Sequence, residues 1–257
     1  MPAHNLATKS FWEDTYLTGE TAVARPSNEF GFDRALVRVL EQRASVPEGA
    51  TLLEIGCAPA KWMAFYAERF GAKPDGIEYA AGGVELSRAN LAACGVEGVV
   101  HHADFWEFEF EKPYDAVFSL GFIEHFDAVD DAFDRHIDLV APGGILILGI
   151  PNFQGATRIA QRWSDPEWLA LHNMKAMGHK RYVRRAEAAG LEVRSVDYFG
   201  GFDPDVISTR KRGRKLLAPI WHLRQRTQRE GPNASWLSSY LLMVFAKPAA
   251  APAGRFS

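Results

Sequence analysis

Short apolar runs alternate with longer amphipathic segments through the middle of the chain. The apolar runs predict strands at 51–55, 75–79, 97–101, 114–120 and 144–150. The segments between them predict helices at 60–70, 82–93 and 127–140. Because the strands are apolar throughout, we expect both of their faces to be buried, as in a parallel sheet covered by helices. The pattern therefore predicts an α/β fold with a doubly wound sheet.

The flanking regions add to this pattern without repeating it. Two amphipathic helices are expected before it, at 10–20 and 32–44, and after it a helix at 180–189 and strands at 191–198 and 237–246. The last two strands lack a clear crossover between them, which favours an antiparallel hairpin. We therefore expect a mostly parallel seven-stranded sheet with an antiparallel last strand and helices on both faces. The expected organisation is an N-terminal helical lid (1–48), a main domain (49–246) with insertions at 151–179 and 204–234, and a disordered tail (247–257).

Composition and charge narrow the class of protein. Apolar residues make up 47% of the chain and charged residues 24%, which is typical of a globular protein. No apolar run approaches the roughly 18 residues of a membrane span, and the N-terminus lacks the apolar core of a signal peptide, so we expect a cytoplasmic protein without stable membrane insertion. The two cysteines, Cys57 and Cys94, give neither a disulfide framework nor a metal spacing.

Acidic or small residues follow four successive predicted strands. These are Glu54 with Gly56, then Glu78 with Tyr79, then Asp104 with Phe105, and finally Ser119–Gly121. In a parallel sheet, these carboxyl ends meet at one edge and converge on one ligand. A carboxylate after the second strand suits both hydroxyls of a ribose, and one after the third suits an exocyclic amine. Small residues in the first turn let backbone groups approach the ligand closely.

The series E-x-G-C-A-P-A, G-I-E-Y, A-D-F and Y-D-A-V-F-S-L-G-F-I-E-H-F resembles class I S-adenosylmethionine-dependent methyltransferases over residues 50–150. The resemblance implies that S-adenosylmethionine is the cofactor and S-adenosylhomocysteine the product. It assigns the ribose to Glu78, the adenine to Asp104 and Phe105, and the methionine portion to the first turn and Ser119–Gly121. The N-terminal F-W-E-D-T-Y resembles the lid helix that many members fold over the cofactor. The cofactor-binding residues implied are Trp12, Tyr16, Glu54, Gly56, Cys57, Ala58, Lys61, Trp62, Glu78, Tyr79, Asp104, Phe105, Ser119, Leu120 and Gly121.

The first turn departs from the family pattern E-x-G-x-G-x-G. Ala58 and Ala60 stand where the second and third glycines are usual. Alanine avoids positive φ, so we expect Ala58 either in an ordinary backbone region or strained, with Pro59 suited to a helix start. A nicotinamide-binding Rossmann fold is the nearest competitor, but the turn lacks G-x-G-x-x-G and little chain remains for a substrate domain.

Three histidines are candidates for the base that a hydroxyl acceptor needs. His172 lies in the insertion expected to cross the active site and is preferred, His125 lies just past the fourth strand, and His179 sits beside two basic residues. Members of the family with quinol substrates bind a metal through E-x-x-E-H at this position. Gly121 replaces the first glutamate here, so we expect no metal site.

Motifs that the sequence lacks exclude some classes of methyl acceptor. The family's Asn/Asp-Pro-Pro-aromatic motif for base amines is replaced by Ser119-Leu120-Gly121-Phe122, and the chain carries a net charge of −3, so we expect no nucleic-acid partner. Residues 209–230 carry +7, so the remainder carries −10. This basic segment is interpreted as a solvated helix, a clamp for an anionic substrate, or a contact with a membrane surface or partner.

The predicted function is O-methylation of a small-molecule acceptor with histidine-assisted deprotonation. N- or C-methylation of a small molecule remains an alternative, as does a catalytically silent module that binds cofactor or a partner. The altered first turn favours the silent module, whereas Glu78, Asp104 and the Glu124-His125 pair favour an enzyme. Assembly as a homodimer is also left open.

Overall fold

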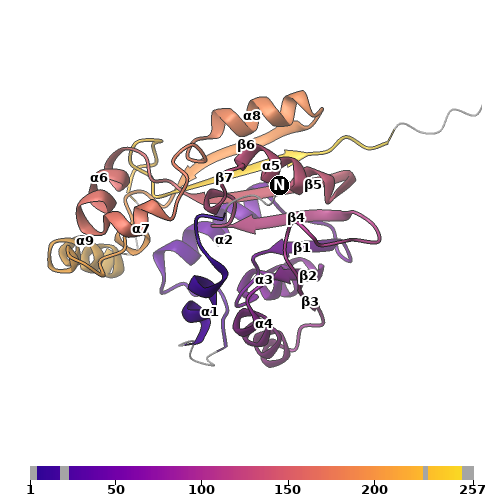
Figure 1. Ribbon diagram of the computed structural model, residues 1–257, viewed down its shortest axis with the longest axis horizontal. Helices are drawn as coiled ribbons and strands as arrows, with labels where there is room; N and C mark the ends of the chain where they lie inside the picture. Colours follow the sequence, from indigo (N-terminus) through magenta and orange to yellow (C-terminus); the bar gives the residue numbers. More distant parts are fainter. Residues whose placement is uncertain (1–4, 18–22, 228–230, 251–257) are drawn as a thin grey trace, which may run out of the picture.

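The computed structural model describes residues 5–17, 23–227 and 231–250. In this part of the chain, seven strands form one sheet in the order β3-β2-β1-β4-β5-β7-β6 (Figure 1). Neighbouring strands are parallel except at β7, which is antiparallel to both β5 and β6. The strands are β1 (Thr51–Ile55), β2 (Lys73–Glu78), β3 (Val99–His102), β4 (Tyr114–Leu120), β5 (Val140–Pro151), β6 (Glu192–Phe199) and β7 (Tyr240–Ala246).

Helices cover both faces of the sheet, and α6, α7 and α9 gather at one end of it (Figure 1). Two 3-10 turns, Ile123–His125 and Pro204–Val206, complete the fold. None of the helices described is long and apolar enough to cross a membrane. The helices are α1 (Lys9–Leu17), α2 (Gly31–Arg43), α3 (Lys61–Phe70), α4 (Ala81–Cys94), α5 (Val129–Asp138), α6 (Gly155–Ser164), α7 (Pro166–Ala170), α8 (His179–Ala188) and α9 (Arg214–Thr227).

The core has two layers because successive residues of a strand point to opposite faces. Leu52 of β1 packs with side chains of α2 and α3, whereas Leu53 packs with side chains of α5 and α8. Both leucines are fully buried, which explains why β1 reads as a continuous apolar run. Helix α2 is also part of this core, since Leu36 and Leu40 are fully buried in it.

The predicted fold class is confirmed, including the antiparallel last strand, and two strands have the predicted limits, β1 and β4. Strand β5 begins at Val140, earlier than predicted, because the Pro-Gly-Gly sequence forms an irregularity within the strand and Gly143 donates a backbone hydrogen bond to Lys247. Strand β7 begins later, at Tyr240. Residues 18–20 of the first predicted helix and 251–257 of the predicted tail lie outside the described residues.

Candidate active site

A cavity of about 250 Å³ lies at the carboxyl edge of β1, β2, β3 and β4. Most of its wall comes from residues that follow these strands, and the N-terminal segment supplies the rest. The convergence predicted from the four strand ends is therefore present. The wall includes Trp12, Tyr16, Gly56, Ala58, Glu78, Tyr79, Asp104, Phe105, Leu120, Gly121 and His125 among the predicted site residues, and Asn5, Ala7, Phe122 and Phe126 among those that were not predicted.

Two carboxylates in this wall are held by backbone N–H groups. Glu78 Oε1 accepts from Ala80 N at 2.9 Å, and Asp104 Oδ1 accepts from Trp106 N at 2.8 Å. Burial raises the pKa of Glu78, while hydrogen bonds from backbone N–H groups oppose that rise. Each carboxylate keeps acceptor capacity beyond these bonds, as the recognition of ribose hydroxyls or an amine requires.

The turn after β1 brings backbone close to the cavity. Gly56 has a φ of +69°, and a Cβ there would lie 2.9 Å from the Phe122 ring, so this position requires glycine. Ala60, the residue before α3, has a φ of +64°. The left-handed conformation that we expected to be a problem at Ala58 is thus adopted at Ala60, in the position of the third glycine.

Five predicted cofactor residues do not line the cavity: Glu54, Cys57, Lys61, Trp62 and Ser119. Glu54 faces the start of α3, where Oε2 accepts from Met63 N at 2.9 Å. Lys61 forms an ion pair of 2.7 Å with buried Asp33, and Trp62 packs edge-on against Phe32. Helix α3 begins at Lys61 and so turns these two side chains toward α2, away from the cavity.

Ser119 is fully buried beneath the cavity wall. Its hydroxyl lies 3.0 Å from Nε2 of His136, whose ring packs 4.9 Å from the ring of Phe105. Burial lowers the pKa of His136 to about 4, so this imidazole is neutral at physiological pH. Ser119 and His136 therefore support Phe105 from below. The sequence contained no motif that pointed to His136.

Helix α1 closes the cavity from the N-terminal side. Trp12 packs edge-on against the His125 ring at 5.3 Å, and Trp12 and Tyr16 are stacked at 6.4 Å. Glu13, which sequence reasoning missed, accepts from the N–H groups of Ala81 and Gly82 at the start of α4, at 2.9 and 3.3 Å. A carboxylate at a helix N-terminus is favoured by the helix dipole, so Glu13 anchors α1 on α4.

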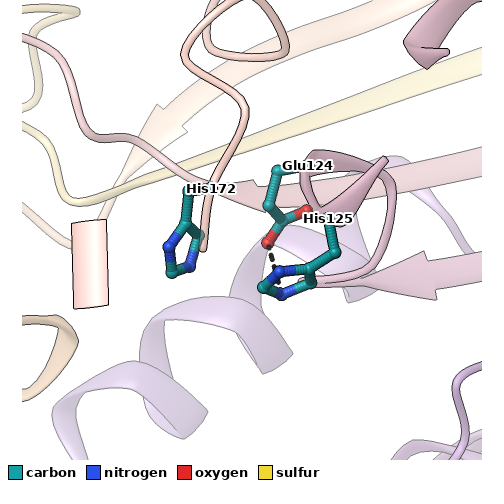
Figure 2. Close-up of side chains that lie close together, drawn as sticks. All are labelled: Glu124, His125 and His172. Carbon is teal, nitrogen blue, oxygen red and sulfur yellow. Dashed lines mark ion pairs between the residues drawn. The ribbon is translucent and has the colours of Figure 1, made fainter. Parts of the chain in front are cut away.

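The two preferred histidines lie side by side next to Glu124, as Figure 2 shows. The His125 and His172 rings are 4.8 Å apart, and Nε2 of His125 lies 3.9 Å from Oε1 of Glu124. His125 lines the cavity, whereas His172 is buried behind it against Phe153. His179 lies apart, at the start of α8, with Nδ1 3.1 Å from the Tyr198 hydroxyl. The structure thus brings together two of the three candidate bases.

Backbone hydrogen bonds join the two segments that carry these side chains. Asn173 N donates to Glu124 O at 2.7 Å, and the Asn173 amide donates to Phe126 O at 2.8 Å. Nδ1 of His125 lies 2.8 Å from Leu171 O. Burial lowers the pKa of both histidines, that of His172 to about 4, and raises the pKa of Glu124 to about 8.

Comparison with known proteins gives the family. A model described as a methyltransferase domain matches residues 28–196. Sphingolipid C9-methyltransferase 1 of Gibberella zeae is 27% identical over 180 residues, which are 65% of this chain and 34% of that protein. The matched stretch therefore spans about a third of that relative.

Solved structures share the fold at low sequence identity. A methyltransferase from Thiobacillus denitrificans in complex with S-adenosyl-L-homocysteine has a TM-score of 0.58 at 15% identity, covering 93% of this chain and 98% of that one. Phosphoethanolamine N-methyltransferase 2 of Haemonchus contortus, in complex with S-adenosyl-L-methionine, has a TM-score of 0.60 at 16% identity, covering 94% and 57%. The chain therefore belongs to the methyltransferase-domain family, and it has the fold of these methyltransferase structures.

Proposed function

We propose that the protein transfers the methyl group of S-adenosylmethionine to a hydroxyl oxygen of a small, largely apolar acceptor that binds beside His125. The observation that carries this proposal is the position of His125 in the cavity wall with Nδ1 2.8 Å from a backbone carbonyl. A carbonyl only accepts, so Nδ1 carries the proton and Nε2 holds the lone pair. The aromatic side chains of Trp12, Phe122 and Phe126 in the same wall suit an apolar acceptor.

The cofactor would occupy the strand-end side of the cavity. In this arrangement Glu78 would accept from the ribose hydroxyls and Asp104 from the adenine amine, with Phe105 against the base. The methionine end would follow the turn at Gly56 and Ala58 toward Leu120 and Gly121. These assignments rest on the lining of the cavity and on the family to which the chain belongs.

Methyl transfer from a sulfonium is an in-line displacement in which the cofactor supplies the leaving group. The acceptor oxygen attacks the methyl carbon, the carbon–sulfur bond breaks with its electron pair going to sulfur, and the hydroxyl proton leaves for Nε2 of His125. We assign this proton transfer to His125 in preference to His172, because His172 is separated from the cavity. The order of the two candidates is therefore the reverse of the one expected from the sequence.

C-methylation is a second candidate, because the curated relative named above is a C9-methyltransferase. Cofactor carrying a ¹³C-labelled methyl group and a panel of alcohol, phenol, amine and olefin acceptors distinguish the two. We expect label on oxygen, read from the carbon chemical shift of the product. Label found only on carbon or nitrogen contradicts O-methylation. Cofactor binding without turnover of any acceptor supports a silent module. The cytoplasmic location and the homodimer stay predictions.

A further inference from the structure

Three side chains from two distant segments point potential metal ligands at one small space (Figure 2). Glu124 and His125 come from the 3-10 turn after β4, and His172 comes from the loop after α7. One ligand atom of each lies within 4.8 Å of the other two. Ligands on one tetrahedral cation are about 3.3 Å apart, so side-chain shifts of about an ångström would complete the site.

The hydrogen bonds of the two imidazoles are those of metal-binding histidines. Nδ1 of His125 lies 2.8 Å from Leu171 O, and Nδ1 of His172 lies 2.9 Å from Trp168 O. Because carbonyl oxygens only accept, each Nδ1 carries a proton and each Nε2 holds a lone pair. Metal-binding histidines usually donate their second N–H in this way, which fixes the tautomer and the ring orientation.

Glu124 has a buried carboxyl group, one oxygen of which has no partner in the described part of the protein. It is 1% exposed, and its Oε2 is buried without a hydrogen-bond partner among the described residues. Its Oε1 lies 3.9 Å from His125 Nε2, beyond hydrogen-bond distance. A buried polar atom of this kind costs free energy unless a ligand pairs with it. A cation between the three side chains would give the carboxylate its missing partner.

We propose that Glu124, His125 and His172 bind a divalent transition-metal cation of the zinc type beside the cofactor cavity. Two imidazoles and one carboxylate suit zinc or iron(II) better than magnesium or calcium, which prefer oxygen ligands. Three protein ligands leave a coordination position for another group. The sequence had predicted no metal because Gly121 replaces the first glutamate of the quinol-type motif. His172, 47 residues beyond His125, supplies a third ligand that this motif lacks.

The cation site deepens the proposed function and rests on it for its role. Of the three ligands, only His125 lines the cavity, so this role requires the open coordination position to face the space assigned to the acceptor hydroxyl. A cation bound to that oxygen lowers the pKa of the hydroxyl, as it does for a bound water. The histidines would then assist deprotonation as ligands of the cation rather than as direct proton acceptors.

Cobalt(II) is the probe for this site, because its visible absorption reports the ligands without any turnover. Purified full-length protein, treated with a chelator and then dialysed against Co²⁺, should retain about one equivalent and show bands of four- or five-coordinate cobalt. His172→Ala and Glu124→Gln should each weaken Co²⁺ binding at least about 100-fold. His222→Ala, at an exposed histidine of α9, should bind like the wild type.

The variants must be shown to fold, so S-adenosylhomocysteine affinity is measured on each and should stay within about threefold of the wild type. Wild-type protein that retains no Co²⁺, or cluster variants that bind it as the wild type does, would overturn the site. Cobalt binding without an O-methylated product would sink the proposed function and leave the site standing. If metal-free protein makes an O-methylated product and takes up no Co²⁺, the metal site is overturned and the proposed function stands.

A second inference comes from the outer surface of α9. Leu216, Ile220 and Leu223 are spaced four and three residues apart, so they lie on one helix face, and they are 65%, 39% and 61% exposed. The adjacent face of α9 is attached to the protein through buried Leu217 and through Arg224, whose guanidinium lies 3.2 Å from Asp203. The outward face of a surface helix is normally polar, so this apolar stripe indicates a binding surface.

Helix α6 adds two exposed apolar side chains next to the start of α9, and both segments carry exposed basic residues. Trp163 of α6 is 44% exposed, lies against Gly213 at the start of α9 and stacks under the Arg212 guanidinium at 5.4 Å. Ile159, one helical turn earlier, is 74% exposed. One of the surrounding cations, Lys211, is also paired with Glu167 at 2.7 Å. The exposed cations are Arg158, Arg162, Arg210, Lys211, Arg212, Arg214, Lys215 and Arg226.

We infer that the α6–α9 surface, defined by Ile159, Trp163, Leu216, Ile220 and Leu223 with these cations, docks on an anionic lipid surface. Charge complementarity selects this partner: a row of aliphatic and aromatic side chains bordered by Arg and Lys is the composition of helices that lie in the membrane interface. Each cation near an anionic leaflet adds attraction, which salt weakens. Residues 209–227 hold seven Arg or Lys and no Asp or Glu, in a chain whose net charge is −3.

Vesicle co-sedimentation tests this surface. Wild-type protein should sediment with vesicles of phosphatidylcholine mixed with phosphatidylglycerol, bind pure phosphatidylcholine at least about tenfold more weakly, and lose affinity as salt rises. Leu216→Glu with Leu223→Glu should reduce binding about 100-fold. Val99→Glu, the same kind of change at a 53% exposed valine of β3, should not.

Two results would overturn the docking surface. The first is equal binding of the double variant and the wild type to the mixed vesicles. The second is a wild type that ignores vesicles but elutes as a dimer, together with a double variant that elutes as a monomer. That second result would mean that the apolar stripe of α9 binds a second copy of the chain.

Discussion

The two sides of the cavity are built differently. On the side that we assign to the cofactor, the wall follows four neighbouring parallel strands, so β1, β2, β3 and β4 bring their terminal residues to one edge through the register of the sheet alone. On the side that we assign to the acceptor, the wall depends on contacts between a 3-10 turn and a loop 46 residues away. There Nδ1 of His125 donates a hydrogen bond to Leu171 O. The cofactor side is therefore local and repetitive in sequence, whereas the acceptor side depends on tertiary contacts that no short motif encodes.

This difference predicts that cofactor-side variants change cofactor affinity and that acceptor-side variants change turnover. The largest effect is expected at His125. His125→Ala should lower turnover on the order of 100-fold, because it removes either a proton acceptor or a metal ligand, with cofactor Kd within about twofold of the wild type. His179→Ala is the matched control, since this histidine lies apart at the start of α8. A large rise in cofactor Kd for His125→Ala would mean that the two sides are not separable.

Glu78→Ala tests the cofactor side in the same way. It removes a carboxylate expected to accept from two ribose hydroxyls, each hydrogen bond being worth about 1 kcal/mol, so cofactor Kd should rise about 30-fold. Calorimetry with S-adenosylhomocysteine measures this effect without an acceptor. Glu85→Ala, at an exposed glutamate of α4, is the control. An unchanged Kd would show that Glu78 does not contact the ribose.

The Glu13→Gln variant tests whether the contact of α1 with α4 contributes to cofactor binding. Hydrogen bonds from Ala81 and Gly82 lower the pKa of Glu13, so the anchor is present above the ordinary glutamate pKa and is lost as the pH falls through the lowered value. We expect cofactor Kd to rise about fivefold in the variant. Asp14→Asn, the exposed neighbour, should leave Kd unchanged. If both variants behave alike, α1 is not held by this contact.

The same difference explains which parts of the site could be predicted from the sequence. The strand ends at Glu78 and Asp104 were predictable, because alternating apolar runs determine the sheet and the sheet determines the edge. The direction of Lys61 and Trp62 was not, because it depends on how α3 begins and on the position of Asp33 in α2. Glu13 and His136 carried no signal either, since each acts through a partner that is distant in sequence.

The smallest expected effect lies in the turn after β1, where Ala60 adopts a φ of +64°. A left-handed alanine costs about 1–2 kcal/mol. Ala60→Gly removes that cost, but the greater freedom of glycine in the unfolded chain lowers stability by up to about 1 kcal/mol. We therefore expect the free energy of unfolding to rise by about 0.5 kcal/mol, measured by urea denaturation.

Ala64→Gly, one turn later in the interior of α3, provides the opposite control. There the backbone is already helical, so glycine should lower the free energy of unfolding by about 1 kcal/mol. A difference of sign between the two variants would confirm that Ala60, and not the helix as a whole, carries the strain. Equal destabilisation at both positions would mean that the turn accommodates alanine without cost. In that case this departure from the glycine pattern would cost the fold no stability.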